Sequence, residues 1–170
     1  MADTTIRNIF VVGLRNAHAV ENEALSIMNR QIERIENYPE MAARLREHVD
    51  ETERQLRRLD EILGGLGEDA STFKDMSASI MGSVAAMGHA MAGDEILKNA
   101  FADYAFENYE IAAYRSLIDV AEAAGARQAV SLLQTSLAEE EQMARWIEAE
   151  LPAVTRRYLS LETAGLKADR

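Results

Sequence analysis

Glu107-Asn-Tyr-Glu110-Ile-Ala-Ala-Tyr114 places two carboxylates three residues apart inside an apolar, helix-compatible segment. Residues three or four apart share one face of a helix, so Glu110 falls on the same stripe as Phe106 and Leu117. Glu107 and Tyr114 lie beside that stripe, which should be buried. A buried carboxylate costs on the order of several kcal/mol unless it is protonated, paired or bound to a metal. The interpretation of this stretch therefore depends on whether other predicted helices also direct carboxylates into the core.

Composition and charge narrow the classes of protein to which this chain can belong. Helix-forming residues such as Leu, Ala, Glu and Met are abundant, aromatic residues make up only 6%, and the two prolines are at positions 39 and 152. These features favour an all-helical protein. The net charge of −11 argues against a nucleic-acid partner, whose phosphates would be repelled. The absence of cysteine excludes disulfides and thiolate metal sites.

Length and hydropathy predict one soluble domain. The 170 residues are most simply a single domain, residues 1–170, with a core that should span about 5–151. The sequence contains no 18-residue apolar run and no signal peptide. We therefore expect no membrane partner and a cytoplasmic location.

Two long helices are predicted in the first half of the chain. Helical spacing of apolar residues continues from about residue 6 to 36, and Glu21 falls within that apolar track. Asn37-Tyr-Pro39 interrupts the pattern, and Pro39 suits the first turn of a second helix, which ends at Gly64-Gly65-Leu-Gly67. His48 and Gln55 border its apolar stripe, and Glu51 lies further round the helix on the His48 side.

The second half predicts two more long helices after a weakly patterned connection. A short methionine-rich helix is expected between Glu68 and Gly93, although two internal glycines weaken its pattern. A third long helix should span about 95–124. A fourth should run from near Ala126 to Leu151, with Glu140 in its apolar stripe.

The chain is expected to end in a short helix and a frayed tail. Pro152 should stop or kink the fourth helix, residues 153–163 should form a short last helix, and the tail from Gly165 should be loose. The joints within each helix pair are short, whereas about 30 residues connect the second and third helices. This predicts an all-α, ferritin-like antiparallel four-helix bundle with a long crossover between helices 2 and 3 that contains a short helix.

Three inward carboxylates indicate a metal site. Glu21, Glu110 and Glu140 each occupy a mid-helix position that the local pattern would give to an apolar residue. A non-haem dinuclear site needs such carboxylates on facing helices, supplemented by imidazole. The usual Glu-x-x-His pair is absent, His48-x-x-Glu51 is its nearest substitute, and no Lys or Arg lies on the inner stripes. The predicted metal ligands are Glu21, His48, Glu51, Glu107, Glu110 and Glu140.

Other polar residues are predicted to surround the site or to lie outside it. Glu139 and Glu141 are expected on the outer face of the fourth helix, and the crossover methionines fit flexible packing better than a copper site. Each candidate ligand has an alternative: a carboxylate could be solvated at the stripe edge, and His48 could be a core histidine bonded to one carboxylate. The side chains predicted to support the ligands are Gln55, Tyr114, Thr52 and His18.

Four stretches occur in order with a characteristic spacing: Leu14-Arg-Asn-Ala-His-Ala-Val-Glu21, His48-Val-Asp-Glu51-Thr52-Glu-Arg-Gln55, Glu107-Asn-Tyr-Glu110-Ile-Ala-Ala-Tyr114 and Leu137-Ala-Glu139-Glu140-Glu141. Together, over about residues 5–150, they resemble the YciE/YciF-type bacterial stress proteins of the ferritin-like superfamily. The resemblance implies a rubrerythrin-like four-helix bundle, a homodimer and a di-iron or related site. The chain departs from the family pattern at Asn16, His18, Asn108 and Ala144, where the family has Asp, Tyr, His and Asp.

Three functions remain open on the sequence. The first is a stress-related protein that binds iron, mono- or dinuclear, with Mn or Zn as substitutes, and reacts with a small oxidant such as oxygen or peroxide. The second is a non-catalytic dimeric bundle with a vestigial or empty metal site. The third, a ferritin-type iron store, requires a large closed shell, which nothing in the sequence indicates. Whether the chain is an enzyme is left open.

Overall fold

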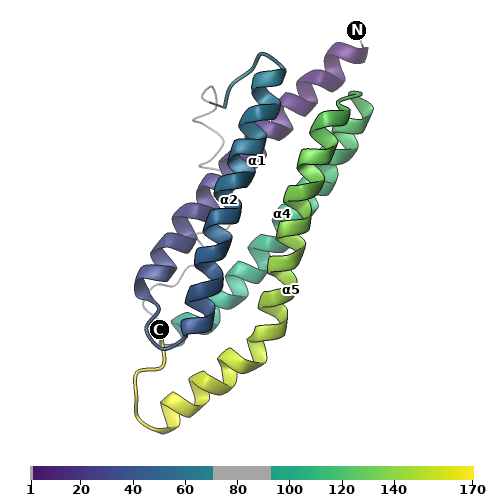
Figure 1. Cartoon of the computed structure of the whole chain (residues 1–170). Coiled ribbons are helices and arrows are strands. Elements are labelled where there is room, and N and C mark those ends of the chain that lie inside the picture. The colour runs from purple at the N-terminus through teal and green to yellow at the C-terminus, as the bar shows by residue number, and fades with distance from the viewer. Residues whose placement is uncertain (1, 71–92) are drawn as a thin grey trace.

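The computed structural model describes residues 2–70 and 93–170, in which four long helices dominate (Figure 1). No strand occurs in these two ranges, so the predicted all-α class is confirmed. The short helix expected in the crossover lies outside the described residues. Within the part of the chain that the structure describes, no helix is long and apolar enough to span a membrane. The four helices are α1 (Ala2–Arg34), α2 (Pro39–Gly65), α4 (Glu95–Ala123) and α5 (Arg127–Thr163).

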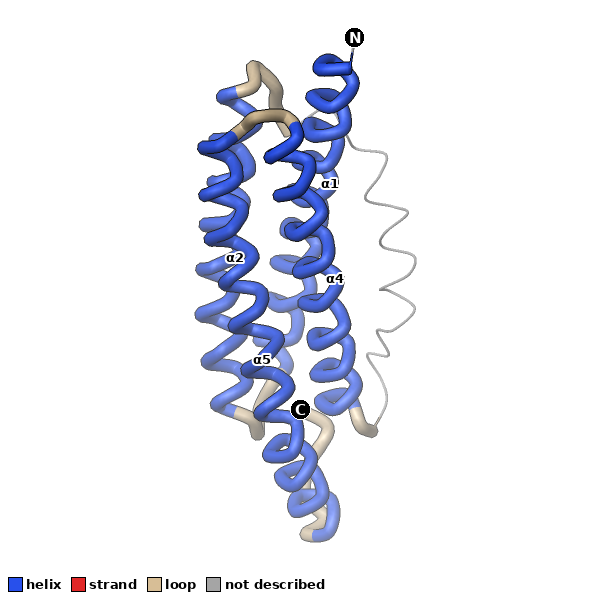
Figure 2. The backbone as a smooth tube through the Cα atoms, turned by 90° about the vertical axis from the view of Figure 1, so that its right-hand side faces the viewer, coloured by secondary structure: helices blue, strands red, loops and turns tan. Residues whose placement is uncertain are grey.

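The helices pack as two antiparallel pairs that lie side by side (Figure 2). α1 packs against α2 and α4 packs against α5, and the pairs meet where α1 contacts α4 and α2 contacts α5. In Figure 1, α1 descends and α2 returns, while α4 rises and α5 descends. α2 therefore ends, and α4 begins, at opposite ends of the bundle. This is the arrangement predicted for a bundle with one long crossover.

Proline and glycine residues define the ends of the helices. Pro39 lies in the first turn of α2, where its missing N–H needs no intrahelical partner. Gly125, between α4 and α5, has a positive φ of 70°, a backbone conformation that residues with a Cβ rarely adopt. Gly125 therefore permits the short reversal that keeps α4 and α5 antiparallel.

α5 differs from the prediction at its C-terminal end. Pro152 lies inside one continuous helix, so residues 153–163 extend α5 instead of forming a separate short helix. A proline inside a helix removes one backbone hydrogen bond and costs about 3 kcal/mol or more. Burial of Val154 and Leu161 against the core offsets this cost. In Figure 1 the last part of α5 turns aside and extends beyond the ends of the other helices.

The prediction of a frayed tail is wrong. After Gly165 the chain returns to the bundle, where Tyr38 Oη donates a hydrogen bond to the Ala168 carbonyl at 2.6 Å. The Ile96 amide donates to the Asp169 carbonyl at 2.9 Å. Ala168 is buried as well. These contacts, made between segments distant in sequence, hold the tail against the α1–α2 turn and the start of α4.

A polar layer divides the core of the bundle into two apolar clusters. One cluster contains Leu45, Phe106 and Met143, and the other contains Leu14 and Leu133. Each helix carries polar residues at the level between the two clusters, and these residues are buried. Because the neighbouring turns of every helix are apolar, water has little access to this layer. The buried polar residues at this level are Glu21, His48, Thr52, Gln55, Glu107, Glu110 and Glu140.

Close packing of α1 against α4 depends on Gly13. A Cβ added at Gly13 would lie 2.8 Å from Leu117 Cδ1, whereas one added at Gly64 in α2 meets nothing within 4 Å. We expect Gly13→Val to lower the free energy of unfolding by about 1–3 kcal/mol, because the buried Leu117 side chain has to shift to make room for the added volume. Urea denaturation measures this change, with Gly64→Val as the matched control. Equal effects of the two substitutions would contradict the close contact.

Candidate metal centre

Three of the predicted ligands meet inside the bundle. His48 on α2, Glu107 on α4 and Glu140 on α5 each offer one donor atom, and these atoms lie within 4.8 Å of one another. His48 Nε2 is 3.3 Å from Glu107 Oε2 and 3.4 Å from Glu140 Oε2. All three side chains are buried. An imidazole and two carboxylates from three different helices thus converge on one point, as ligands of a metal do.

Glu21 and Glu110 extend the centre to α1 and along α4. Both are buried, and the charge of Glu140 affects the pKa of each. Tyr114 Oη donates a hydrogen bond to Glu21 Oε1. Among residues 2–70 and 93–170, five buried carboxylate oxygens have no hydrogen-bond partner: Glu21 Oε2, Glu107 Oε2, both oxygens of Glu110, and Glu140 Oε2.

Burial makes the centre retain protons. Loss of hydration raises the pKa of Glu21 and Glu110 well above 4.5, and the Glu140 charge raises both further. Burial also raises the pKa of Glu107 to about 8, although His48 opposes the change. For His48 itself, burial would lower the pKa, but the nearby carboxylates, Glu107 foremost, raise it well above 6.5. The centre therefore favours bound protons, which a cation can replace.

The donor set fits a divalent metal. Leaving a buried polar group without a partner costs about 1–3 kcal/mol, and more when the group is charged. Two of the five unpartnered oxygens, Glu107 Oε2 and Glu140 Oε2, lie beside the His48 imidazole, and such a set of hard oxygen donors with one nitrogen suits iron, manganese or zinc. A bound cation would satisfy these oxygens and balance their charge together.

Glu51 lies on the outer side of His48. His48 Nδ1 is 2.7 Å from Glu51 Oε2, and Arg44 Nη2 donates to the same oxygen at 3.0 Å. Burial would raise the pKa of Glu51, but hydrogen bonds from His48 and Arg44 outweigh it and lower the pKa to about 2. With 16% of its side chain exposed, Glu51 is placed to orient the imidazole. Its role as a direct ligand stays a prediction.

α2 also holds Glu140, through Gln55. Gln55 Nε2 donates to Glu140 Oε1 and, at 3.2 Å, to Glu139 Oε2. Arg58 donates to the two oxygens of Glu139 at 2.7 and 2.8 Å. The expectation that Glu139 belongs to the outer face is therefore corrected, because only 18% of its side chain is exposed and it links α5 to α2. Thr52, one turn before Gln55, is buried in the same layer.

His18 lies apart from the other predicted supporting residues. Its Nδ1 is 3.1 Å from Asn22 Nδ2, and its Nε2 is 3.3 Å from Asp60 Oδ1. The side chain is 22% exposed. Both ring nitrogens thus face residues that were not predicted as ligands. The structure brings Gln55 and Tyr114 to the carboxylates, but places His18 at the α1–α2 surface.

Four further polar residues near the centre were not among the predicted ligands or supporting residues: Gln31, Arg44, Arg58 and Asp103. Asp103 is buried, accepts a hydrogen bond from Gln31 Nε2 at 2.7 Å, and burial raises its pKa to about 7. The sequence could have indicated Asp103, because a residue four positions before Glu107 lies on the same face of a helix. No Lys or Arg was expected on the inner stripes themselves, and the structure places Arg44 and Arg58 at the edge of the centre, where they pair with Glu51 and Glu139.

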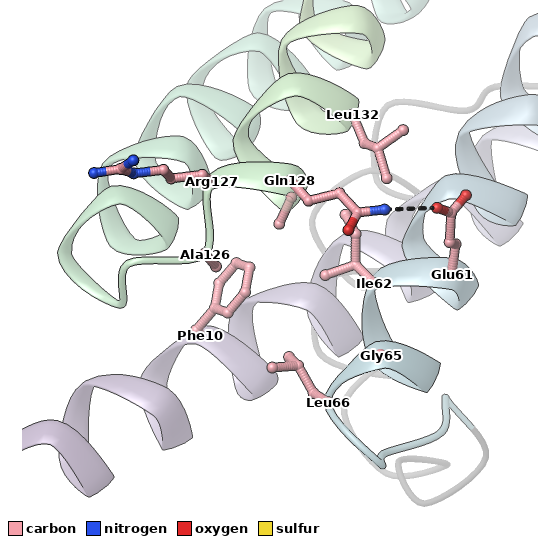
Figure 3. Close-up of a pocket in the computed structure, with 10 residues that line it drawn as sticks. Phe10, Glu61, Ile62, Gly65, Leu66, Ala126, Arg127, Gln128 and Leu132 are labelled. Carbon is pink, nitrogen blue, oxygen red and sulfur yellow. Dashed lines mark hydrogen bonds between the residues drawn. The ribbon is translucent and has the colours of Figure 1, made fainter.

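Two pockets in the described part of the chain lie away from the carboxylate layer, at the ends of the bundle. Figure 3 shows one of about 370 Å³, lined mainly by apolar side chains of α1, α2 and α5 such as Phe10, Ile62 and Leu132. Gln128 Nε2 donates a long hydrogen bond of 3.4 Å to Glu61 across it. The second, of about 420 Å³, lies beside the α1–α2 turn. Neither pocket is lined by a predicted ligand, so the buried carboxylate layer is the candidate site.

Comparison with known proteins agrees with this architecture. The chain is 28% identical to protein YciF of Escherichia coli over 148 residues, which cover 81% of this chain and 84% of that protein. A crystal structure of a Xanthomonas campestris protein matches with a TM-score of 0.80 and 32% identity, covering 94% and 99% of the two chains. A Desulfovibrio desulfuricans bacterioferritin, described with a diiron site, matches with a TM-score of 0.71 and 19% identity, covering 91% and 84%.

The family match spans nearly the whole bundle. Residues 5–160 match the model of a family described as a domain of unknown function, DUF892. The YciF relative confirms the resemblance to YciE/YciF-type proteins, and the bacterioferritin confirms the ferritin-like fold. The chain therefore belongs to the DUF892 family and has a ferritin-like four-helix fold with a buried His/Glu/Glu cluster.

Proposed function

We propose that this protein binds iron, as one ion or two, in the buried layer between the helices, and reacts there with oxygen or peroxide. The observation that carries the proposal is the set of five buried carboxylate oxygens without hydrogen-bond partners in the described residues, beside the imidazole of His48. In a purely structural core each of these oxygens would destabilise the fold unless it is protonated, whereas a bound cation would satisfy them all. The ligands would be Glu21, His48, Glu107, Glu110 and Glu140.

The remaining side chains of the layer would position these ligands. Tyr114 holds one oxygen of Glu21, Gln55 holds one oxygen of Glu140, and Glu51 orients His48. Apolar residues above and below exclude water from the layer. Bound iron would supply electron transfer to a small oxidant. The protein would then protect the cell from loose iron or from the oxidant. This task is consistent with the description of its relative, Escherichia coli YciF, as a stress protein.

The donor atoms of the centre favour iron or manganese over zinc and copper. Four carboxylates and a single imidazole are hard or intermediate ligands, which suit Fe²⁺ and Mn²⁺, while Zn²⁺ more often takes a compact set richer in nitrogen or sulfur. Copper is disfavoured because the cluster offers one imidazole with carboxylates and the chain contains no cysteine. Mn or Zn would be taken up when iron is scarce.

The direct test is the metal content of the purified protein. The untagged chain would be isolated from iron-supplemented cells, and its metal measured by elemental mass spectrometry together with an air-exposed ultraviolet–visible spectrum. We expect between one and two irons per chain and a near-ultraviolet charge-transfer band. A protein that stays metal-free after anaerobic loading with Fe²⁺ or Mn²⁺ would contradict the proposal and favour a non-catalytic bundle.

The same preparation tests the predicted homodimer. Phe101 and Tyr109 are about half exposed on α4, as Ile9 is on α1, and large apolar side chains at the surface favour self-association. Sedimentation velocity would give the mass of the particle. A mass near twice 18.9 kDa supports a dimer, whereas a large closed shell would support an iron store.

A further inference from the structure

Among the described residues, three polar connections lie at the edge of the buried centre, and they differ in charge. Behind His48, Glu51 is paired with Arg44. Behind Glu140, the neighbouring Glu139 is paired with Arg58 through two hydrogen bonds. At each of these two connections an arginine already neutralises the carboxylate, so the carboxylate attracts an approaching cation only weakly. The third connection, along the seam between α1 and α4, is different.

At the α1–α4 seam, a carboxylate faces a neutral amide. Asp103 accepts a hydrogen bond from Gln31 Nε2, and within the described residues it has no cationic partner. Arg34, one turn further out on α1, is held by both oxygens of Glu95 at 2.6 Å. Gln31 Oε1 is buried and unpartnered in the described residues, so a second oxygen is free beside Asp103. This seam therefore offers an approaching cation a carboxylate that no arginine neutralises, unlike the other two connections.

Asp103 also begins a row of carboxylates that leads inward. Asp103, Glu107 and Glu110 follow one face of α4, and their exposed fractions fall from 7% to 4% to 2%. A cavity of about 10 Å³, room for roughly one water, is lined by both Asp103 and Glu107. Met28 forms part of its wall, and a flexible thioether side chain can move aside as an ion passes.

We propose that Asp103 and Gln31 form the entry position for the divalent cation, which binds there transiently and then transfers to Glu107. Asp103 steers the ion and replaces part of its hydration with a carboxylate oxygen, and Gln31 offers its amide oxygen. The inference rests on the proposed metal centre. In this proposal Asp103 controls the rate at which metal is taken up, and the inner ligands determine the affinity at equilibrium.

Stopped-flow uptake of Co²⁺ tests this role without any oxidant. Trp146, the single tryptophan of the chain, lies on α5 six residues beyond Glu140, so bound Co²⁺ should quench its fluorescence. At pH 8, where Asp103 with its pKa of about 7 is mostly ionised, we expect Asp103→Asn to slow uptake by about tenfold, the lower limit of what a focused local field adds to an on-rate. The Co²⁺ bound per chain at equilibrium should equal that of the unmodified protein.

The controls separate steering from folding and from net charge. Asp103→Asn removes a buried charge and keeps a hydrogen-bonding partner for Gln31, so the fold should not be weakened. Asp119→Asn makes the same charge change at an exposed position of α4 and should alter the rate by less than about twofold. Gln31→Met, which removes the amide without changing charge, should also slow uptake.

The outcomes distinguish the two proposals. If the unmodified protein binds Co²⁺ and Asp103→Asn loads at the same rate, the entry role is wrong and the metal centre stands. If Asp103→Asn loses bound Co²⁺ at equilibrium, Asp103 is a ligand and not an entry residue, which also overturns the inference. If the unmodified protein takes up no metal, the metal centre itself is wrong.

Discussion

Glu140→Gln is expected to lower the affinity of the protein for Fe²⁺ or Co²⁺ by more than about 100-fold, beyond the 10- to 100-fold typical of changes next to a metal ligand. Glu140 is fully buried and faces His48 Nε2 with one oxygen, while Gln55 holds the other. Its charge also acts on Glu21 and Glu110. An amide in its place keeps the volume but removes the negative charge at the meeting point of the helices.

Isothermal titration calorimetry under anaerobic conditions measures this loss of affinity. Glu141→Gln is the matched control, because the next residue of α5 makes the same change of charge and shape, while Glu141 instead pairs at the surface with Arg115 and Arg145. The control should bind within about twofold of the unmodified protein, as surface charges are screened by salt. Similar affinities for Glu140→Gln and Glu141→Gln would show that the metal does not bind at Glu140.

The inward carboxylates could be predicted because helical periodicity is a local property. Glu21, Glu110 and Glu140 were identified as the positions where an apolar stripe is interrupted, and all three are buried in the structure. Short joints and one long connection were enough to order the helices. The bundle and its polar layer therefore follow from spacing along single helices.

Features that depend on contacts between distant segments could not be predicted in this way. Arg58 meets Glu139 across 81 residues, and Gln31 meets Asp103 across 72. The hydrogen bond from Tyr38 to Ala168 spans 130 residues, and it turns a tail that looks disordered in the sequence into an ordered one. Pro152 shows the same limit, because tertiary burial of the residues after it overrides its local tendency to end a helix.

The metal-free protein is expected to become less stable as the pH rises from about 5 to about 9. The pKa of Glu107 in the folded protein is about 8, against 4.5 for an ordinary glutamate, so the folded state binds this proton more tightly than the unfolded state. Its contribution to stability is fully present below about pH 4.5 and is lost as the pH rises through about 8. Glu21, Glu110 and His48, whose pKa values are also raised, change stability in the same direction.

At acidic pH, Glu51 has the opposite effect on the stability of the folded protein. Its pKa of about 2 lies below 4.5, so its ion pair contributes stability above about pH 4.5 that is lost as the pH falls through about 2. The melting temperature of the metal-free protein should therefore be highest near pH 5, which thermal unfolding followed by circular dichroism can measure. Glu110→Gln should flatten the decline toward high pH, because the amide needs no proton to be buried. A melting temperature that rises from pH 5 to 9 would contradict the burial of these carboxylates.

Added metal should reverse this dependence if the layer is a metal centre. Binding requires deprotonated ligands, so the stabilisation by saturating Co²⁺ should grow with pH over the range in which the metal-free protein weakens. A bundle whose carboxylates serve only as protonated core residues would show the same decline with or without Co²⁺. The difference between the two melting curves therefore separates a working metal centre from a vestigial one, and it does so without knowledge of the oxidant.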